Sequence, residues 1–307
     1  MPDDSVPGIH DQDGPRLTRE AISGMAGRLK EVSLQYEPAI DTLWITLEYR
    51  ERACFSQQQL DDYRRLFADL KSFQDACRTS GAAPLKFAVF RSSEPGVWCL
   101  GGDLDLFSSC IRTQDRDRLL AYAYGCVDAG FLANVSLDCG ILTVCLVQGQ
   151  ALGGGLESAR SCQVVIAEEG STFGLPEIRF NMFPGMGAFS FLGRRIGLPA
   201  AIDLMTSGEI LDADRLLEMR GIDRLVPKGE GESATRAYIR SIHRQHGAHL
   251  AIQAARQIMD PISLEEVRAI TKHWVESAMK VPESDLKLMA RIVRSQAGLR
   301  SRLQASE

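Results

Sequence analysis

The strongest constraint on the fold is a short apolar segment followed at once by a glycine-rich turn. Residues 141–147 read ILTVCLV, and nearly every position is apolar, a pattern typical of a strand buried on both faces of a sheet. The segment is far shorter than the ~20 residues that a helix needs to cross a bilayer. The turn leads into a helix-like stretch within residues 148–161. A buried strand that feeds a helix predicts an α/β protein with parallel strands.

Other parts of the chain repeat this alternation of strands and helices. Strands are expected twice within residues 31–50, joined by a tight turn, and again at 85–92 and 164–167; helices are expected at 56–80, at 114–134 and in most of the chain beyond about 190. Ligands of such sheets bind where the strand ends meet the loops, so the functional residues are expected in those turns.

Composition and charge fit a globular protein and restrict its partners. The 307 residues are 45% hydrophobic, which allows a sizeable core. Lysine and arginine number 35 against 40 aspartates and glutamates, so the net charge of −5 excludes nucleic acid as the main partner. We predict a mobile polar tail at residues 1–30, an α/β core with the active site at 31–210, and a mainly helical region at 211–307 that supplies a pocket lid and oligomer contacts.

The cysteines and the first residues indicate the compartment. Eight cysteines are present but no Cys-x-x-Cys pair, so zinc-ribbon, iron–sulfur and thioredoxin-like sites lack their spacing. The first twenty residues are acidic and polar where an export signal would be basic and then apolar. We therefore predict a soluble cytoplasmic protein with reduced thiols, no membrane partner, no metal and no cofactor.

Two glycine-bearing turns are candidates for binding a negative oxygen. The first is WCLGGDL (98–104), with Leu100 and Gly101, and the second is ALGGGLE (151–157), with Gly153 and Gly154. Glycine allows a ligand to approach the backbone closely, and N–H groups at a helix start are free to donate. The two turns together favour an oxyanion hole. Each turn by itself also fits an ordinary strand-to-helix connection, and the second does not match a dinucleotide or phosphate loop.

Two glutamates, Glu157 and Glu177, stand near these turns. Glu177 lies in FGLPEI (173–178), among apolar neighbours that would raise its pKa toward neutrality and make it usable as an acid or base. Two carboxyl groups at one site can divide the acid and base roles. The alternative is that Glu177 is a surface residue after a turn. No histidine lies between residues 31 and 240, so a Ser-His-Asp arrangement is disfavoured.

These stretches together resemble the crotonase (enoyl-CoA hydratase) superfamily over roughly residues 32–230. The resemblance implies a crotonase-like spiral of ββα units with a helical C-terminal region. It also implies that the backbone N–H groups of Leu100 and Gly154 form the oxyanion hole, beside Gly101 and Gly153, and that Glu157 and Glu177 are catalytic. Retention of both glutamates is similar to the hydratases and dehydratases of the superfamily.

A narrower resemblance extends over all but the first thirty residues. Residues 166–197 and 264–279 look like the diffusible signal factor synthases, bacterial crotonase-like enzymes of quorum sensing. This family implies dehydration of a 3-hydroxyacyl-acyl carrier protein to a cis-2-enoyl thioester, followed by hydrolysis to a cis-2-unsaturated fatty acid. It further implies that Trp274 lines the acyl pocket, that a sensor histidine kinase can be a partner, and that the protein is a homo-oligomer, a trimer or hexamer as in the superfamily.

A medium-chain acyl group requires an apolar pocket. The residues expected to line it are Leu152, Met182, Phe183, Met186, Phe189 and Trp274. A basic surface with Arg291, Arg294, Arg300 and Arg302 is expected to receive the acidic carrier protein. The alternatives are an enoyl-CoA hydratase, an acyl-CoA thioesterase, or a crotonase-like partner of a sensor kinase without turnover.

Overall fold

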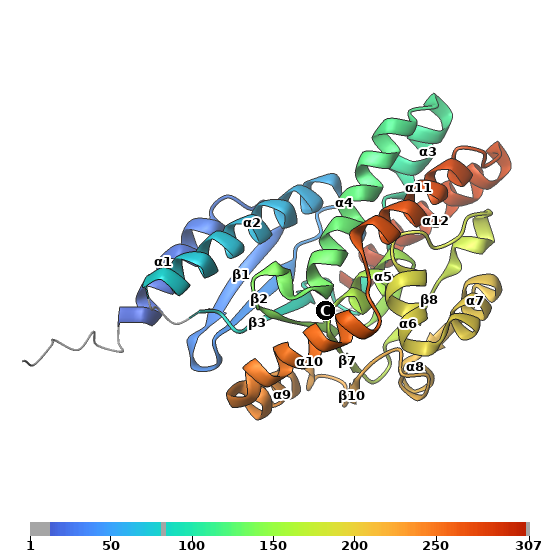
Figure 1. The fold of residues 1–307 in the computed structure, drawn as a ribbon. Coiled ribbons are helices and arrows are strands. Elements are labelled where there is room, and N and C mark those ends of the chain that lie inside the picture. Colours follow the sequence, from blue (N-terminus) through green and yellow to red (C-terminus); the bar gives the residue numbers. More distant parts are fainter. Residues whose placement is uncertain (1–12, 81–83, 305–307) are drawn as a thin grey trace, which may run out of the picture.

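A computed structural model describes residues 13–80 and 84–304 in two sheets surrounded by helices (Figure 1). The larger sheet has the strand order β1-β2-β3-β5-β7-β10 and the smaller one β4-β6-β8-β9. The strands of the larger sheet are β1 (Val32–Glu37), β2 (Thr42–Leu47), β3 (Phe87–Ser92), β5 (Leu142–Val147), β7 (Val164–Glu168) and β10 (Arg224–Val226). Those of the smaller sheet are β4 (Val97–Cys99), β6 (Gln150–Leu152), β8 (Thr172–Gly174) and β9 (Ile210–Asp212).

The two sheets are built from repeated ββα units. In each unit the first strand joins the larger sheet, the next strand joins the smaller one, and the chain then enters a helix. Strands β3 and β4 precede α3 (Leu104–Thr113), β5 and β6 precede α5 (Gly154–Ser161), and β7 and β8 precede the 3₁₀ helix η3 (Pro176–Phe180). Within each sheet these strands pair in parallel. The predicted α/β class and its spiral of ββα units are therefore confirmed.

The apolar residues of these segments explain why they form the core. All six residues of β5 are buried, as expected for a strand covered on both faces. Helix α2 (Gln57–Ser80) covers one face through apolar residues at helical spacing, such as Leu66 and Leu70. The antiparallel pair β1 and β2 closes one edge of the larger sheet. The short strands of the smaller sheet, three residues each, are too short to show a two-residue period.

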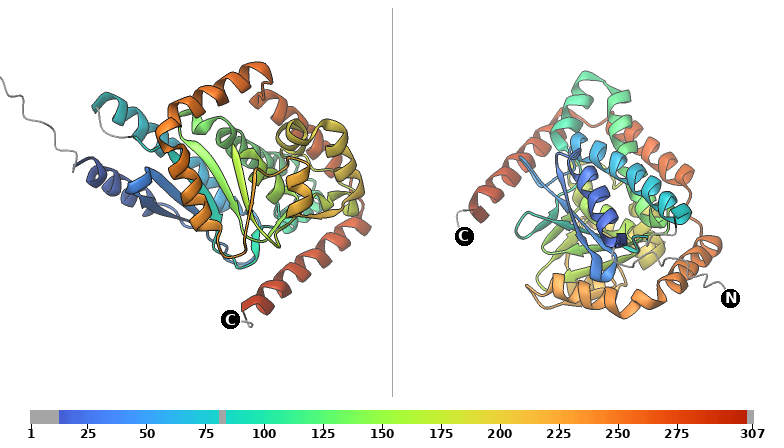
Figure 2. Two further views of the ribbon diagram at one scale, coloured as in Figure 1. Left: turned by 90° about the horizontal axis from the view of Figure 1, so that it is seen from below. Right: turned by 90° about the vertical axis from the view of Figure 1, so that its left-hand side faces the viewer.

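The chain beyond the sheets is mainly helical, as predicted. The remaining helices are α4 (Arg116–Asn134), α6 (Gly193–Ile196), α7 (Leu198–Ser207), α8 (Ala213–Glu218), α9 (Gly231–Ile242), α10 (His246–Met259), α11 (Leu264–Ala278) and α12 (Glu283–Gln304). Helix α11 packs along α4, and α12 begins against α3 and then projects away from the body of the protein (Figure 2).

The prediction of a mobile tail over residues 1–30 is wrong in part. Residues 13–26 form helix α1 (Asp13–Ala26), which buries Ile22 and Met25 against the core. These apolar residues recur three positions apart, so a short amphipathic helix can dock although the composition of the segment is polar. Residues 1–12 lie outside the described part of the chain.

Two other expectations can be compared with the structure. All eight cysteines are free thiols. Within the part of the chain that the structure describes, no helix combines the length and apolarity needed to cross a membrane.

Candidate active site

The two glycine turns lie against each other, as the oxyanion-hole prediction requires. Strands β4 and β6, which lead into the turns, pair in parallel. The indole N–H of Trp98 donates a hydrogen bond to the carbonyl oxygen of Gly155 at 3.0 Å. A Cβ atom at Gly155 would lie 2.1 Å from the carbonyl oxygen of Cys99, so only glycine allows this approach. The close contact fixes the two turns relative to each other.

Three of the four predicted oxyanion residues, Leu100, Gly101 and Gly153, use their N–H groups in the fold itself. The N–H of Leu100 donates to the carbonyl oxygen of Ala53 at 2.6 Å, and that of Gly153 donates to the carbonyl oxygen of Gly174 at 2.8 Å. The N–H of Leu100 was expected to donate to a ligand oxygen in the oxyanion hole. The structure corrects this expectation, because a ligand oxygen could use the Leu100 N–H only at the expense of an existing hydrogen bond.

Gly154 is the predicted residue whose N–H remains available. It is the first residue of α5, where the helix provides no acceptor for the N–H. Among the described residues the structure gives this N–H no partner, whereas the N–H of Gly101 donates a hydrogen bond to Sγ of Cys99 at 3.4 Å. Gly102 was not predicted from the sequence as an oxyanion residue. Its N–H has no acceptor among the described residues, and it lies beside Gly154, since a Cβ atom there would be 3.4 Å from the nitrogen of Gly102.

Glu157 is held by the backbone of a distant loop. Its side chain is only 3% exposed, and its Oε1 accepts hydrogen bonds from the N–H groups of Met186 at 2.8 Å and Ala188 at 2.9 Å. Burial raises the pKa of Glu157 to about 7, while the two N–H donors oppose this rise. Sequence spacing could not reveal these donors, since they come from a turn about thirty residues away.

Glu177 faces the same site from η3. Its Oε1 lies against Gly153, where a Cβ atom would be only 2.4 Å away. Its Oε2 is buried and has no hydrogen-bond partner among the described residues. Burial and the negative charge of Glu157 raise the pKa of Glu177 well above its ordinary value. The pair therefore favours a carboxylate on Glu157, which receives two N–H donors, and the shared proton on Glu177.

A cavity of about 250 Å³ opens between the turns and the C-terminal helices. Both glutamates line it, together with Leu100, Gly101, Gly153 and Gly154. Of the residues predicted to line an acyl pocket, Leu152, Met182, Met186 and Trp274 line this cavity. Phe183 and Phe189 line neither this cavity nor its neighbour. Their rings pack on each other with centroids 6.1 Å apart, which corrects the prediction for these two.

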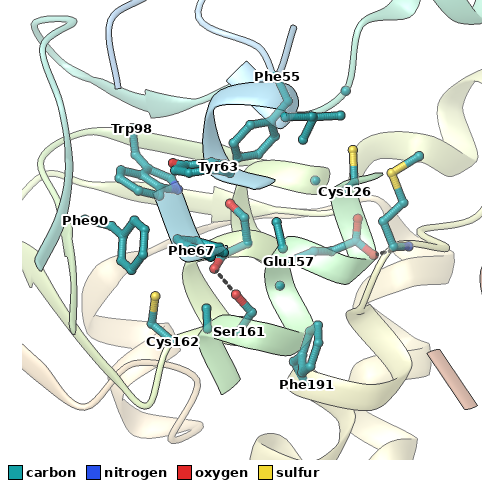
Figure 3. A pocket seen from close by; sticks show the side chains of 18 residues that line it. Phe55, Tyr63, Phe67, Phe90, Trp98, Cys126, Glu157, Ser161, Cys162 and Phe191 are labelled. Carbon is teal, nitrogen blue, oxygen red and sulfur yellow. Dashed lines mark hydrogen bonds between the residues drawn. The ribbon is translucent and has the colours of Figure 1, made fainter. Parts of the chain in front are cut away.

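A second, smaller cavity of about 50 Å³ adjoins the first at Glu157 (Figure 3). Both cavities are lined by Gly102, Gly154, Glu157 and Met186. Figure 3 shows Phe55, Tyr63 and Trp98 on one side of the smaller cavity and Phe191 on the opposite side. The hydroxyls of Ser158 and Ser161 donate to backbone carbonyls. The lining is therefore mostly apolar, and much of it comes from α2 and α4, which sequence reasoning did not connect to the site.

Comparison with known proteins places this arrangement in a family. A model of the enoyl-CoA hydratase/isomerase family matches residues 70–284. The chain is 30% identical over 194 residues to the peroxisomal fatty acid beta-oxidation multifunctional protein AIM1 of Arabidopsis thaliana, covering 63% of this chain and 26% of that protein. It is 35% identical over 121 residues to a probable enoyl-CoA hydratase of Mycobacterium bovis, covering 39% and 45%. The matches thus span less than half the length of either relative.

Solved structures agree at the level of the fold. An enoyl-CoA hydratase/isomerase from Xanthobacter autotrophicus Py2 has a TM-score of 0.70 at 18% identity, covering 89% of this chain and 97% of that one. An enoyl-CoA hydratase from Bacillus halodurans has a TM-score of 0.69 at 18% identity, covering 86% and 100%. Because the family model spans most of the chain, including both glycine turns and both glutamates, the chain belongs to the enoyl-CoA hydratase/isomerase family.

Proposed function

We propose that the chain dehydrates a 3-hydroxyacyl group on acyl carrier protein to a cis-2-enoyl thioester and hydrolyses this thioester, releasing a cis-2-unsaturated fatty acid signal. One observation carries the proposal. The buried Glu157, the half-buried Glu177 and the N–H of Gly154 border a single, mostly apolar cavity whose wall includes Trp274. Such a site can bind an acyl thioester and move protons over it without a nucleophilic side chain.

The dehydration needs one acid and one base. Glu177, as the carboxylate, takes the proton from the carbon next to the thioester carbonyl, and the enolate charge collects on the carbonyl oxygen near the Gly154 N–H. Glu157, as the acid, gives its proton to the 3-hydroxyl group, which leaves as water. The resting pair holds its proton on Glu177, which suits the reverse reaction, the addition of water. Movement of this one proton between the two glutamates serves both directions.

The hydrolysis can use the same groups. Water attacks the thioester carbonyl while a glutamate carboxylate accepts one of its protons. The oxyanion that forms lies near the Gly154 N–H. The carbon–sulfur bond then breaks, and the thiol of the carrier leaves with that proton, so that the free acid remains.

The acyl tail has space beyond the reacting carbons. The two cavities adjoin at Glu157, so a chain attached to a thioester in the larger cavity can extend into the smaller, aromatic one. The hydrophobic lining favours a fatty acyl group over a polar one. Binding of a sensor histidine kinase and assembly into a trimer or hexamer are further proposals from the same family resemblance.

The curated relatives favour a second candidate, an enoyl-CoA hydratase that uses CoA thioesters. The decisive experiment incubates the purified protein with a medium-chain 3-hydroxyacyl group on acyl carrier protein and, separately, on CoA. Mass spectrometry then identifies the free acids and thioesters. We expect a free cis-2-unsaturated acid from the carrier-linked substrate. Reversible hydration of the CoA thioester without any free acid would instead support the second candidate.

Charge reversal on α12 tests whether the arginines of this helix bind the acyl carrier protein. The side chains of Arg291 and Arg294 are exposed and close to Ile292, which lines the cavity; Arg300 and Arg302 have no described side chains. The double variant Arg291→Glu/Arg294→Glu should lower kcat/KM for the carrier-linked substrate by about tenfold, because interfacial charges steer association. Turnover of the same 3-hydroxyacyl group on N-acetylcysteamine, an uncharged thiol that replaces the carrier protein, should not change.

A matched control reverses two exposed arginines far from the cavity. Arg240 lies in the last turn of α9 and Arg244 just beyond its end, and the variant Arg240→Glu/Arg244→Glu changes the total charge equally. It should leave carrier-linked turnover close to that of the wild type. Equal losses in the two double variants, or no loss in the α12 variant, would remove α12 from carrier recognition.

A further inference from the structure

Helix α11 holds the loop that donates hydrogen bonds to Glu157. The side chain of Thr271 is fully buried, and its hydroxyl donates to the carbonyl oxygen of Gly185 at 2.9 Å. The carbonyl oxygen of Val267, one helical turn earlier, is a second acceptor for the same hydroxyl proton, also at 2.9 Å. Of these two contacts, only the one with Gly185 connects α11 to another segment, the loop of residues 185–188.

One helical turn later, Trp274 contacts the same point of the loop. A Cβ atom at Gly185 would lie 2.3 Å from the Cβ atom of Trp274, so the backbone of Gly185 packs directly against this side chain. Residues three apart on a helix share a face. Thr271 and Trp274 therefore hold Gly185 by a hydrogen bond and by packing at once.

The carbonyl of Gly185 belongs to the same peptide group as the N–H of Met186. A trans peptide group is planar, and its C=O and N–H bonds point in opposite directions. When the hydroxyl of Thr271 fixes the carbonyl on one side, the N–H on the other side is directed at the Oε1 of Glu157, 2.8 Å from the nitrogen. Hydrogen bonds in such a chain also polarise each other.

We propose that Thr271 is a positioning residue for Glu157, acting through the peptide group between Gly185 and Met186. Without its hydroxyl, this peptide group is free to rotate, and Glu157 loses one of its two N–H donors. The second donor, Ala188, follows Gly187, whose φ of +138° is open to glycine but strained for other residues. The loop conformation thus depends on the anchor at Gly185.

The measurable consequence is a change in the protonation of Glu157. Hydrogen-bond donors stabilise a carboxylate, so loss of one donor should raise its pKa above about 7. The titratable groups that face Glu157 are Glu177 from η3 and Cys126 from α4. Burial raises the pKa of Cys126 far above its usual value, so only Glu177 interferes. The Glu177→Gln background removes that interference.

The test is a titration of the Glu157 carboxyl carbon by ¹³C NMR in this background, without substrate. The signal is assigned by its disappearance in Glu157→Gln. In Thr271→Val, which retains the shape but lacks the hydroxyl, we expect the midpoint to rise by about one pH unit, a tenfold change in the protonation equilibrium. Thr271→Ser should restore the original midpoint. Because no substrate is used, the result does not depend on the proposed function.

Thr235→Val provides a matched control, since Thr235 is also fully buried but its hydroxyl has no partner among the described residues. Its midpoint should equal that of the parent protein. A purely structural role of Thr271 would lower the melting temperature and leave the midpoint unchanged, and this result would overturn the inference. If Thr271→Val does not fold, Thr271→Ala is measured in its place with the same expected rise.

Discussion

Glu157→Gln and Glu177→Gln should each lower the formation of free acid by at least 10²-fold while the protein remains folded. Glutamine keeps the size of the side chain but can neither accept nor release the catalytic proton, and general acid–base catalysis typically contributes about 10²–10⁴-fold. Product formation from the carrier-linked substrate, followed by mass spectrometry, measures the loss. Full activity in either variant would remove that glutamate from the mechanism.

Glu157→Gln should also change the stability of the fold, and in the opposite direction to its effect on activity. In the folded protein the pKa of Glu157 is raised from 4.5 to about 7, so this group favours folding less and less as the pH rises through that range. Glutamine removes this dependence. Glu157→Gln should therefore gain stability relative to the wild type between pH 5 and pH 8, by an amount on the order of 3 kcal/mol at most. Denaturant unfolding at both pH values measures the difference, and a decrease would contradict the raised pKa of Glu157.

Gly153→Ala should lower turnover by about 10²-fold, because an added methyl group would displace Glu177. The new Cβ atom would lie 2.4 Å from Oε1 of Glu177, and the φ of Gly153 is +55°. The carboxyl group must move by up to about 1 Å to reach an ordinary contact distance. A misplacement of about 1 Å can cost about 10²-fold in rate. Steady-state turnover and thermal unfolding of the variant are the measurements.

Gly170→Ala is the control that separates this clash from backbone strain. Gly170 has a φ of +83°, so alanine is strained there too, yet nothing lies within 4 Å of its new Cβ atom. We expect a loss of about 1–2 kcal/mol in stability and nearly normal turnover. Equal activity losses in the two alanine variants would show that strain, rather than contact with Glu177, accounts for the effect.

The sequence could predict the features that depend on neighbouring residues. The uniformly apolar run of β5 predicted a buried strand, and the helical spacing of Leu66 and Leu70 predicted α2. The family motifs identified Glu157, Glu177 and the two glycine turns, because each motif is a short continuous segment. The polar composition at the start of the chain concealed α1, whose few apolar residues matter only because a partner surface is available to bury them.

The chemical state of the site depended on contacts between distant segments. Whether an N–H is free is decided by its acceptor: Leu100 donates to Ala53, which lies far from it in the sequence, whereas Gly154 starts a helix and has no acceptor within it. The protonation of the two glutamates likewise depends on burial and on donors from a remote loop. The sequence by itself therefore determined which groups are present, and only the tertiary structure decided which of them are available, since hydrogen bonding and burial are properties of neighbours in space.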